Sequence, residues 1–357
     1  MRATLLLIPT LLAAQVARIE VAETAGLRRF GYPVRARIKT SFSSRPLHLV
    51  SDGKTIAAQF TPLDKDFVEI DFALDLGPGQ KRNFVVEEGA QPPVTEPMSI
   101  EQTVTSYVVR YPGGLAFHVP KDLHGFLSSV QTTDTDYLLP DSSGLSVTCR
   151  DKTEQRVVAV ASRVVKSGPL ACALRFDIAE PLCGDRVVKS AVELEFPRSK
   201  SWVEAHWTVD DPAPGVSGLT AEAHLQLDSQ PLIVDFGAGT MIYATVRSGQ
   251  SARMRSTASG WNIDVNGEDY AVGRMPRAEG WAHLMDRHRA TAVAIEDFAE
   301  TESSIESWAD GRLRIRRDVG QTPKSFTFWL HFVGMPVQIG AATSPQSMMH
   351  PLAVRVQ

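Results

Sequence analysis

The fold class is decided by one stretch, Ser201-Trp202-Val203-Glu204-Ala205-His206-Trp207-Thr208-Val209. Apolar and polar side chains alternate along it, and successive side chains of a β-strand point to opposite faces of a sheet. One face carries Val203, Ala205, Trp207 and Val209, and the other carries Trp202, Glu204, His206 and Thr208. The stretch therefore predicts a strand that buries Trp207 in a core and turns a polar face outward.

A second strand of the same kind follows the loop at 210–218, with Thr220, Glu222, His224 and Gln226 on its outward face. If the two strands form an antiparallel hairpin, His206 lies opposite Glu222 and Glu204 lies opposite His224, with Cβ atoms about 5 Å apart. A carboxylate fixes the tautomer of an imidazole and raises its pKa, so two such pairs could act as acid and base or hold a cation. The alternative is that these residues form charge pairs on a solvated sheet face.

The same alternation recurs along the whole chain, and turn signals such as Asn266-Gly267 separate the apolar runs. This pattern predicts an all-β protein built from a barrel or a sandwich rather than βαβ units. A chain of 357 residues favours two domains. Three prolines interrupt the stretch 88–97, so we expect domains at 18–95 and 98–357.

The N-terminus has one positive charge, a short apolar stretch and then small residues, which is the layout of an export signal over residues 1–17. We therefore expect a periplasmic or extracellular protein. No uncharged apolar stretch reaches the roughly 20 residues that a membrane-spanning helix needs. The net charge of −4 gives no basic field for nucleic acid.

The chain has three cysteines, Cys149, Cys172 and Cys183, so at most one disulfide can form. We interpret them as three buried thiols. None has C-x-x-C spacing, and the sequence predicts no metal site and no cofactor; Ca²⁺ finds no support in it.

Two arginine-containing segments are candidates for anion binding. Arg287, His288 and Arg289 fall in a predicted hairpin loop, where guanidinium groups suit a carboxylate such as that of a uronic acid. Alternation also places Arg312, Arg314 and Arg316 on one strand face, as a ladder for a polyanionic glycan. The alternatives are an ordinary charged hairpin tip and the protection of an edge strand.

Several phrases of the sequence resemble the PcRGLX/YetA-like family, which comprises exo-acting rhamnogalacturonan lyases and their relatives. The first phrase is Glu23-Thr24-Ala25-Gly26-Leu27-Arg28-Arg29-Phe30-Gly31-Tyr32-Pro33-Val34. Others follow in the family's order: Lys166–Leu170, Trp202–His206, Gly280-Trp281, Asp310–Ile315 and Phe326–Phe332. The resemblance implies an N-terminal RIFT-like barrel and a large galactose-mutarotase-like supersandwich. The family's α/α toroid would begin near residue 354, so we expect no toroid in this chain, and the stretch 299–304 departs from the family pattern.

The resemblance and the candidate residues together predict a polysaccharide-directed protein that acts on or binds acidic glycans by β-elimination. That reaction needs a cation or arginine at the uronate, a base and an acid. The candidates are Arg287 for the uronate, His206 as base and Glu222 or His224 as acid. We expect Trp202, Glu204, His288 and Arg289 to bind substrate. The alternative function is a non-catalytic carbohydrate-binding or structural module.

Overall fold

The computed structural model describes residues 15–40, 46–140, 143–184, 187–210, 215–320, 324–334 and 343–357. These residues form two compact units. Unit 1 runs up to Thr95 and also contains Leu352–Gln357, and unit 2 comprises Glu96–Pro351. Most of the predicted export signal lies outside the described residues, and its last three residues belong to the first strand. None of the helices in the described ranges is long and apolar enough to cross a bilayer.

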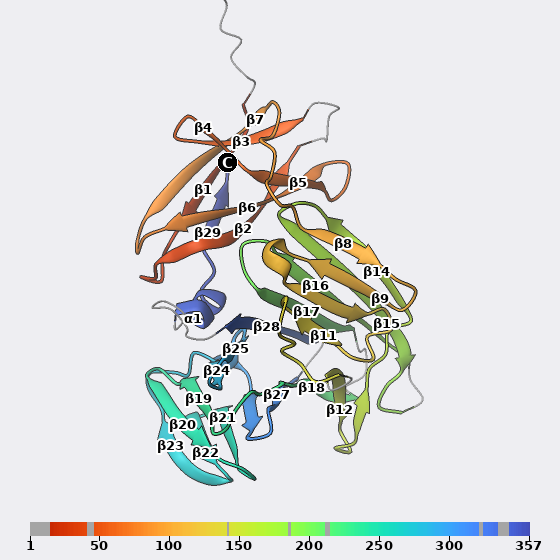
Figure 1. Cartoon of the computed structure of the whole chain (residues 1–357), viewed down its shortest axis with the longest axis vertical. Helices are drawn as coiled ribbons and strands as arrows, with labels where there is room; N and C mark the ends of the chain where they lie inside the picture. The colour runs from red at the N-terminus through yellow and green to blue at the C-terminus, as the bar shows by residue number, and fades with distance from the viewer. Residues whose placement is uncertain are drawn as a thin grey trace, which may run out of the picture. The chain divides into compact units, whose positions relative to one another are not determined.

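Unit 1 consists of two antiparallel sheets (Figure 1). One sheet has the order β29 (Ala353–Val356), β1 (Gln15–Ala22), β7 (Lys81–Glu88), β3 (Leu47–Ser51) and β4 (Lys54–Ile56). The other has the order β2 (Arg29–Lys39), β6 (Phe67–Leu76) and β5 (Ala58–Pro62). The description of this unit as a RIFT-like barrel stays a prediction.

The C-terminal boundary of the predicted sandwich domain, residue 357, is wrong. Strand β29 follows unit 2 in the sequence but belongs to unit 1, where it pairs with β1. Val356 lies opposite Ile19 and Val354 opposite Val21. This pairing supplies hydrogen-bond partners to the edge of β1 that β7 does not cover. The alternation of so short a segment does not reveal which distant strand it joins.

Unit 2 is built around two large antiparallel sheets. The nine-stranded sheet has the order β14 (Ala161–Ser167), β15 (Ala171–Pro181), β16 (Val187–Pro197), β17 (Trp202–Asp210), β28 (Lys324–Gly334), β25 (Arg289–Ile295), β24 (Trp281–Met285), β19 (Leu232–Gly237) and β20 (Met241–Val246). The eight-stranded sheet has the order β13 (Glu154–Arg156), β12 (Gly144–Cys149), β18 (Val216–His224), β27 (Arg312–Asp318), β26 (Ser303–Trp308), β21 (Ser251–Thr257), β22 (Gly260–Val265) and β23 (Glu268–Gly273).

The described part of unit 2 also contains a smaller sheet and one short α-helix. The sheet has the order β11 (Ser129–Gln131), β10 (Ala116–Pro120), β9 (Ser106–Arg110) and β8 (Ser99–Gln102). The helix is α1 (Thr343–Met349). The prediction of an all-β protein with a large sandwich is confirmed, whereas the description of that sandwich as galactose-mutarotase-like stays a prediction.

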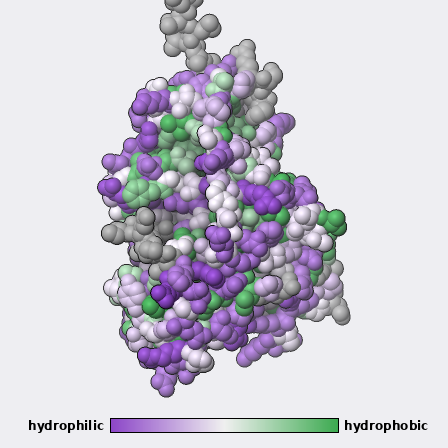
Figure 2. Space-filling model, in the orientation of Figure 1, coloured by the Kyte–Doolittle hydropathy of each residue, from purple (hydrophilic) through white to green (hydrophobic). Residues whose placement is uncertain are grey.

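The core of unit 2 lies between the inner faces of these sheets. Trp207 is fully buried there, and its indole N–H donates to Ser190 Oγ at 2.7 Å. Leu219 and Ile315 of the eight-stranded sheet belong to the same apolar cluster. The predicted inward faces are therefore correct, and Figure 2 shows mostly hydrophilic residues on the surface in view.

The interpretation of the cysteines as three thiols is wrong, because Cys149 and Cys183 form a disulfide. Cys149 ends β12, and Cys183 lies in the turn after β15 with a φ of 56°. Cys172 is buried, and its thiol donates to the Gly168 carbonyl at 3.7 Å. The sequence does not show that the end of β12 and this turn lie side by side, which is why the pairing was not predicted.

Candidate functional site

The two predicted His–carboxylate pairs do not form, because their strands belong to different sheets. Strand β17 lies between β16 and β28 in the nine-stranded sheet, whereas β18 lies between β12 and β27 in the eight-stranded sheet. The chain therefore passes from the nine-stranded sheet to the eight-stranded sheet between β17 and β18. Alternation predicts the inward face of each strand correctly but cannot distinguish a hairpin from such a crossing.

The polar residues of β17 have partners within their own sheet. His206 is exposed, and its Nδ1 lies 2.9 Å from Thr327 Oγ1. Glu204 is half-buried between Glu195 and Trp329 in the register.

Glu222 and His224 make contacts of their own on the eight-stranded sheet. Glu222 forms an ion pair with Arg314 at 2.6 Å, and His224 Nε2 lies 2.9 Å from the Asp310 carbonyl. Neither residue is brought together with His206 or Glu204. The prediction that these four residues form one catalytic site is therefore wrong.

The loop at 286–289 is organised by Asp286. Its carboxylate accepts backbone N–H groups of Asp228, His288 and Arg289 at 2.6–2.7 Å. The His288 ring lies 2.5 Å from the Asp228 carboxylate, and Arg287 is exposed. Because the buried Asp286 carboxylate accepts three backbone N–H groups, it stabilises the turn, and its role is structural.

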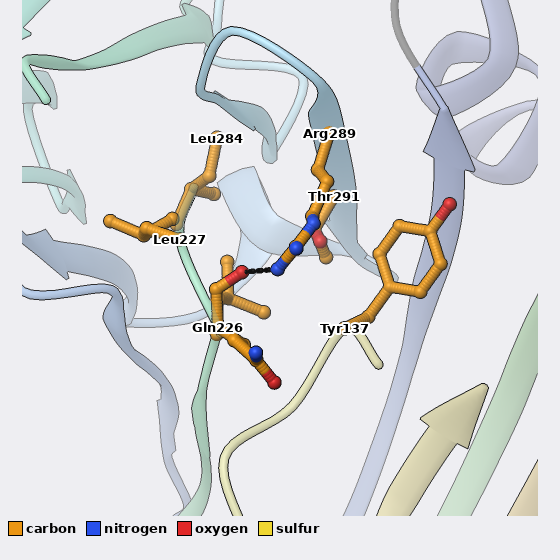
Figure 3. Close-up of a pocket in the computed structure, with 7 residues that line it drawn as sticks. Tyr137, Gln226, Leu227, Leu284, Arg289 and Thr291 are labelled. Carbon is orange, nitrogen blue, oxygen red and sulfur yellow. Dashed lines mark hydrogen bonds between the residues drawn. The ribbon is translucent and has the colours of Figure 1, made fainter. Parts of the chain in front are cut away.

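Arg289 contributes to a small pocket rather than to an open anion site (Figure 3). Its guanidinium donates to the backbone carbonyls of Gln226 and of Asp136, the latter at 3.2 Å. Tyr137 and Leu227 are among the other residues that line the pocket. The space holds no more than about one water molecule, so the pocket does not fit a sugar.

The arginine ladder lies on an interior strand, so its interpretation as edge-strand protection is wrong. The three side chains share one face as predicted, but each has an acidic partner on the protein. Arg312 pairs with Asp310 at 2.9 Å, and Arg316 pairs with Asp318 at 2.7 Å. Because Arg314 is held by Glu222, the ladder is neutralised by its own neighbours.

A different cluster lies on the outer face of the nine-stranded sheet, away from the core. In one row across five strands, Trp202 lies opposite His331, His331 opposite Ala292, Ala292 opposite His283, and His283 opposite Asp235. In the next row, Trp329 and Trp281 lie on either side of Ala294. We call the following six residues the tryptophan–histidine face: Trp202, Trp281, Trp329, His283, His331 and Asp235.

His283 and Asp235 form a buried pair within this face. Asp235 accepts the His283 backbone N–H at 3.1 Å, and its second oxygen lies 3.2 Å from His283 Nδ1. This contact favours the tautomer in which Nδ1 carries the proton and Nε2 is the acceptor. The Trp281 ring meets the His283 ring edge-on at 5.4 Å. The pair is thus oriented as a general base and its supporting carboxylate would be.

His331 is held neutral on the same face. Burial lowers its pKa to about 3, and the charges of Lys200 and His283 add to the effect. Its ring meets the Trp202 ring edge-on at 5.7 Å, and Lys200 Nζ lies 5.8 Å from the same indole.

Helix α1 covers the middle of this face. It lies against β24 and β25, where Ala290, Ala292 and Ala294 give it a flat surface. Met348 of the helix is buried without joining the sandwich core. Gln346 donates to Glu279 at 3.3 Å, and Glu279 also accepts the Trp281 indole N–H.

Next to the buried Asp235, exposed side chains lie at the edge of the sheet, on β19 and β20. Tyr243 lies opposite Asp235 in the register and is 53% exposed, whereas Asp235 is 3% exposed. The described ranges contain no group of three His, Cys, Asp or Glu side chains placed to hold a metal ion.

The sequence carried a signal for this cluster. Trp281-Ala282-His283 and Trp329-Leu330-His331 repeat the pattern Trp-x-His, which places Trp and His on one face of a strand. Asp235 stands as a single acid within an apolar run. Trp329 and His331 do lie on one face of β28, but nothing in the sequence alone brings the two motifs together.

No protein-family model matches this sequence, and no curated protein matches it. Solved structures are similar in fold. A protein of glycosyl hydrolase family 38 from Enterococcus faecalis is 10% identical with a TM-score of 0.61, covering 96% of this chain and 47% of that one. An α-mannosidase from Enterococcus faecalis V583 is 9% identical with a TM-score of 0.56, covering 97% of this chain and 47% of that one. This chain therefore spans about half the length of both structures, and the likeness is one of fold.

Proposed function

We propose that the protein binds a carbohydrate on the tryptophan–histidine face. The observation that carries the proposal is the gathering of three indoles, two imidazoles and a carboxylate on the sheet face that the core does not use. Indole rings provide apolar surface for the C–H face of a sugar, and carboxylate and imidazole groups accept its hydroxyls. The six side chains are buried, and the exposed β19–β20 edge beside Asp235 is where a ligand would approach them.

Two lines of likeness suggest which sugars to try. The resemblance to rhamnogalacturonan lyase relatives favours an acidic pectic glycan, for which Lys200 beside Trp202 supplies a positive charge. The two similar structures are a family 38 glycosyl hydrolase protein and an α-mannosidase, which favours mannose oligosaccharides as a second class. The disulfide, together with the signal-like N-terminus, supports export.

The His283–Asp235 pair is the candidate for chemistry. In a β-elimination, His283 Nε2 would take the C5 proton next to the uronate carboxyl, and the freed electron pair would form the C4–C5 double bond as the C4–O bond breaks. Asp235 would stabilise the resulting imidazolium, which would then return the proton to the leaving oxygen. The second candidate function is binding without turnover. It is favoured by the burial of both side chains, with His283 at 6% and Asp235 at 3% exposed.

Calorimetric titration of the whole chain with rhamnogalacturonan oligosaccharides and with mannohexaose tests the proposal. We expect Asp235→Asn to weaken binding at least tenfold, because His283 loses its orientation. Asp264→Asn is the matched control. Asp264 is 3% exposed, like Asp235, and forms an ion pair with Arg253, but it lies on the eight-stranded sheet. Absorbance of unsaturated products separates turnover from binding. Absence of binding to either glycan, or equal losses in the two variants, would refute the proposal.

A further inference from the structure

An exposed, uncharged strip borders the tryptophan–histidine face. Ile233 of β19 and Met241 and Tyr243 of β20 share the outer face with Asp235, and each is at least 43% exposed. Tyr270 of β23 is 56% exposed, and its hydroxyl donates to the Tyr243 carbonyl at 3.0 Å. We call Ile233, Met241, Tyr243 and Tyr270 the tyrosine strip. Exposed apolar groups gathered in this way mark an interaction surface.

The strip is continuous with the buried cluster through the strand register. Tyr243 is the direct neighbour of Asp235, and Met241 is the direct neighbour of Gly237. The Trp281 indole lies across Gly237, where an added Cβ would be 2.2 Å from the ring. Because Gly237 has no side chain, the Trp281 indole lies next to the tyrosine strip.

The chemistry of the strip fits a sugar better than a second copy of this chain. A strand from another copy would need the backbone acceptors on the free edge of β20, and Tyr270 already occupies the one at Tyr243. Tyrosine offers a flat apolar ring together with a hydroxyl, which suits a ligand with C–H and O–H faces. The stretch Met241–Val246 has no charged residue, so it offers no partner to a uronate.

We propose that the tyrosine strip is a subsite for an uncharged sugar unit of the same oligosaccharide that reaches the tryptophan–histidine face. This inference rests on the proposed function. The strip holds the chain by stacking on Tyr243, outside the region that α1 covers.

Calorimetry with hexasaccharides tests the subsite. We expect Tyr243→Ala to weaken binding of mannohexaose or of a rhamnogalacturonan hexasaccharide about tenfold, and to change binding of hexagalacturonic acid less than twofold. Phe30→Ala is the matched control, because Phe30 is 57% exposed and lies in unit 1. It should leave all three affinities unchanged.

The outcomes separate the two proposals. If wild type binds a hexasaccharide and Asp235→Asn weakens that binding but Tyr243→Ala does not, the subsite is wrong and the proposed function stands. If wild type binds none of the three probes, both fail. Sedimentation velocity adds a further check: self-association that Tyr243→Ala abolishes would assign the strip to contact between copies and overturn the subsite.

Discussion

Replacing Glu23 with Gln should destabilise unit 1 strongly, because Glu23 is a buried carboxylate with several donors. It accepts the backbone N–H groups of Ala25, Gly26 and Gly79 at 2.8–3.1 Å and an N–H of Arg29 at 3.0 Å. Neither side chain of the Glu23–Arg29 pair is more than 1% exposed. The amide of Gln keeps the shape but loses the charge, so the buried guanidinium of Arg29 loses the counter-charge that Glu23 supplies.

The expected magnitude follows from the pKa of Glu23. Burial alone raises that pKa, but hydrogen bonds from Gly79, Arg29, Ala25 and Leu27 outweigh burial and lower it to about 2 from 4.5. At about 1.4 kcal/mol for each pH unit between those values, the ionised carboxylate stabilises unit 1 by about 3 kcal/mol. Because the pKa is lower in the folded state, this stabilisation is complete above pH 4.5 and is lost as the pH falls toward 2.

The assay must report on unit 1 alone. All six tryptophans lie in unit 2, so their fluorescence does not follow unit 1. Urea unfolding read by hydrogen exchange of peptides from 18–39 and, as an internal reference, from 324–334 separates the units. We expect Glu23→Gln to cost about 3 kcal/mol at pH 7 and less than half of that at pH 3.

The control is Glu20→Gln in β1, the strand that ends just before Glu23; it removes a surface ion pair with Lys81 and should cost under about 1 kcal/mol. A loss below about 1 kcal/mol for Glu23→Gln at pH 7, or the same loss at pH 7 and pH 3, would refute the reasoning.

Three further predictions concern unit 2 and can be read by tryptophan fluorescence. Removing the Cys149–Cys183 disulfide, which joins residues 34 apart, should lower the free energy of unfolding by about 4 kcal/mol in urea. His331→Gln should reduce the destabilisation of unit 2 between pH 7 and pH 4 by about 3 kcal/mol, because the unfolded state binds a proton near pH 6.5 and the folded state near pH 3. Gly237→Ala should push Trp281 off the sheet, shift the emission spectrum and cost about 1–3 kcal/mol; an unchanged spectrum would contradict the close approach.

Alternation in the sequence predicts well which side chains of a strand point toward the core, but it predicts poorly which strands pair with one another. It assigned Trp207 to the core and the arginines of β27 to the outside, and both assignments are confirmed. It also placed Trp202 on the outward face, which is correct, although Trp202 is 3% exposed. Alternation shows the direction of a side chain but not what lies above it.

The candidate site could not be predicted for the same reason. Asp235 and His283 are 48 residues apart, and they meet because β19 and β24 are neighbours in the nine-stranded sheet. The predicted pair of His206 and Glu222 was close in sequence, and a hairpin was the simplest connection. The chain instead crosses between sheets there, and each strand pairs with distant parts of the sequence.

The pairing of β29 with β1 has a consequence for the order in which the protein is made. Strand β29 follows unit 2 in the sequence, so the ribosome completes all of unit 2 before the five-stranded sheet of unit 1 gains β29. Until then, β1 carries an open edge on the nascent chain. Unit 2 is therefore an insertion whose own folding must bring the two ends of unit 1 back together, and a fault in unit 2 leaves unit 1 unfinished as well.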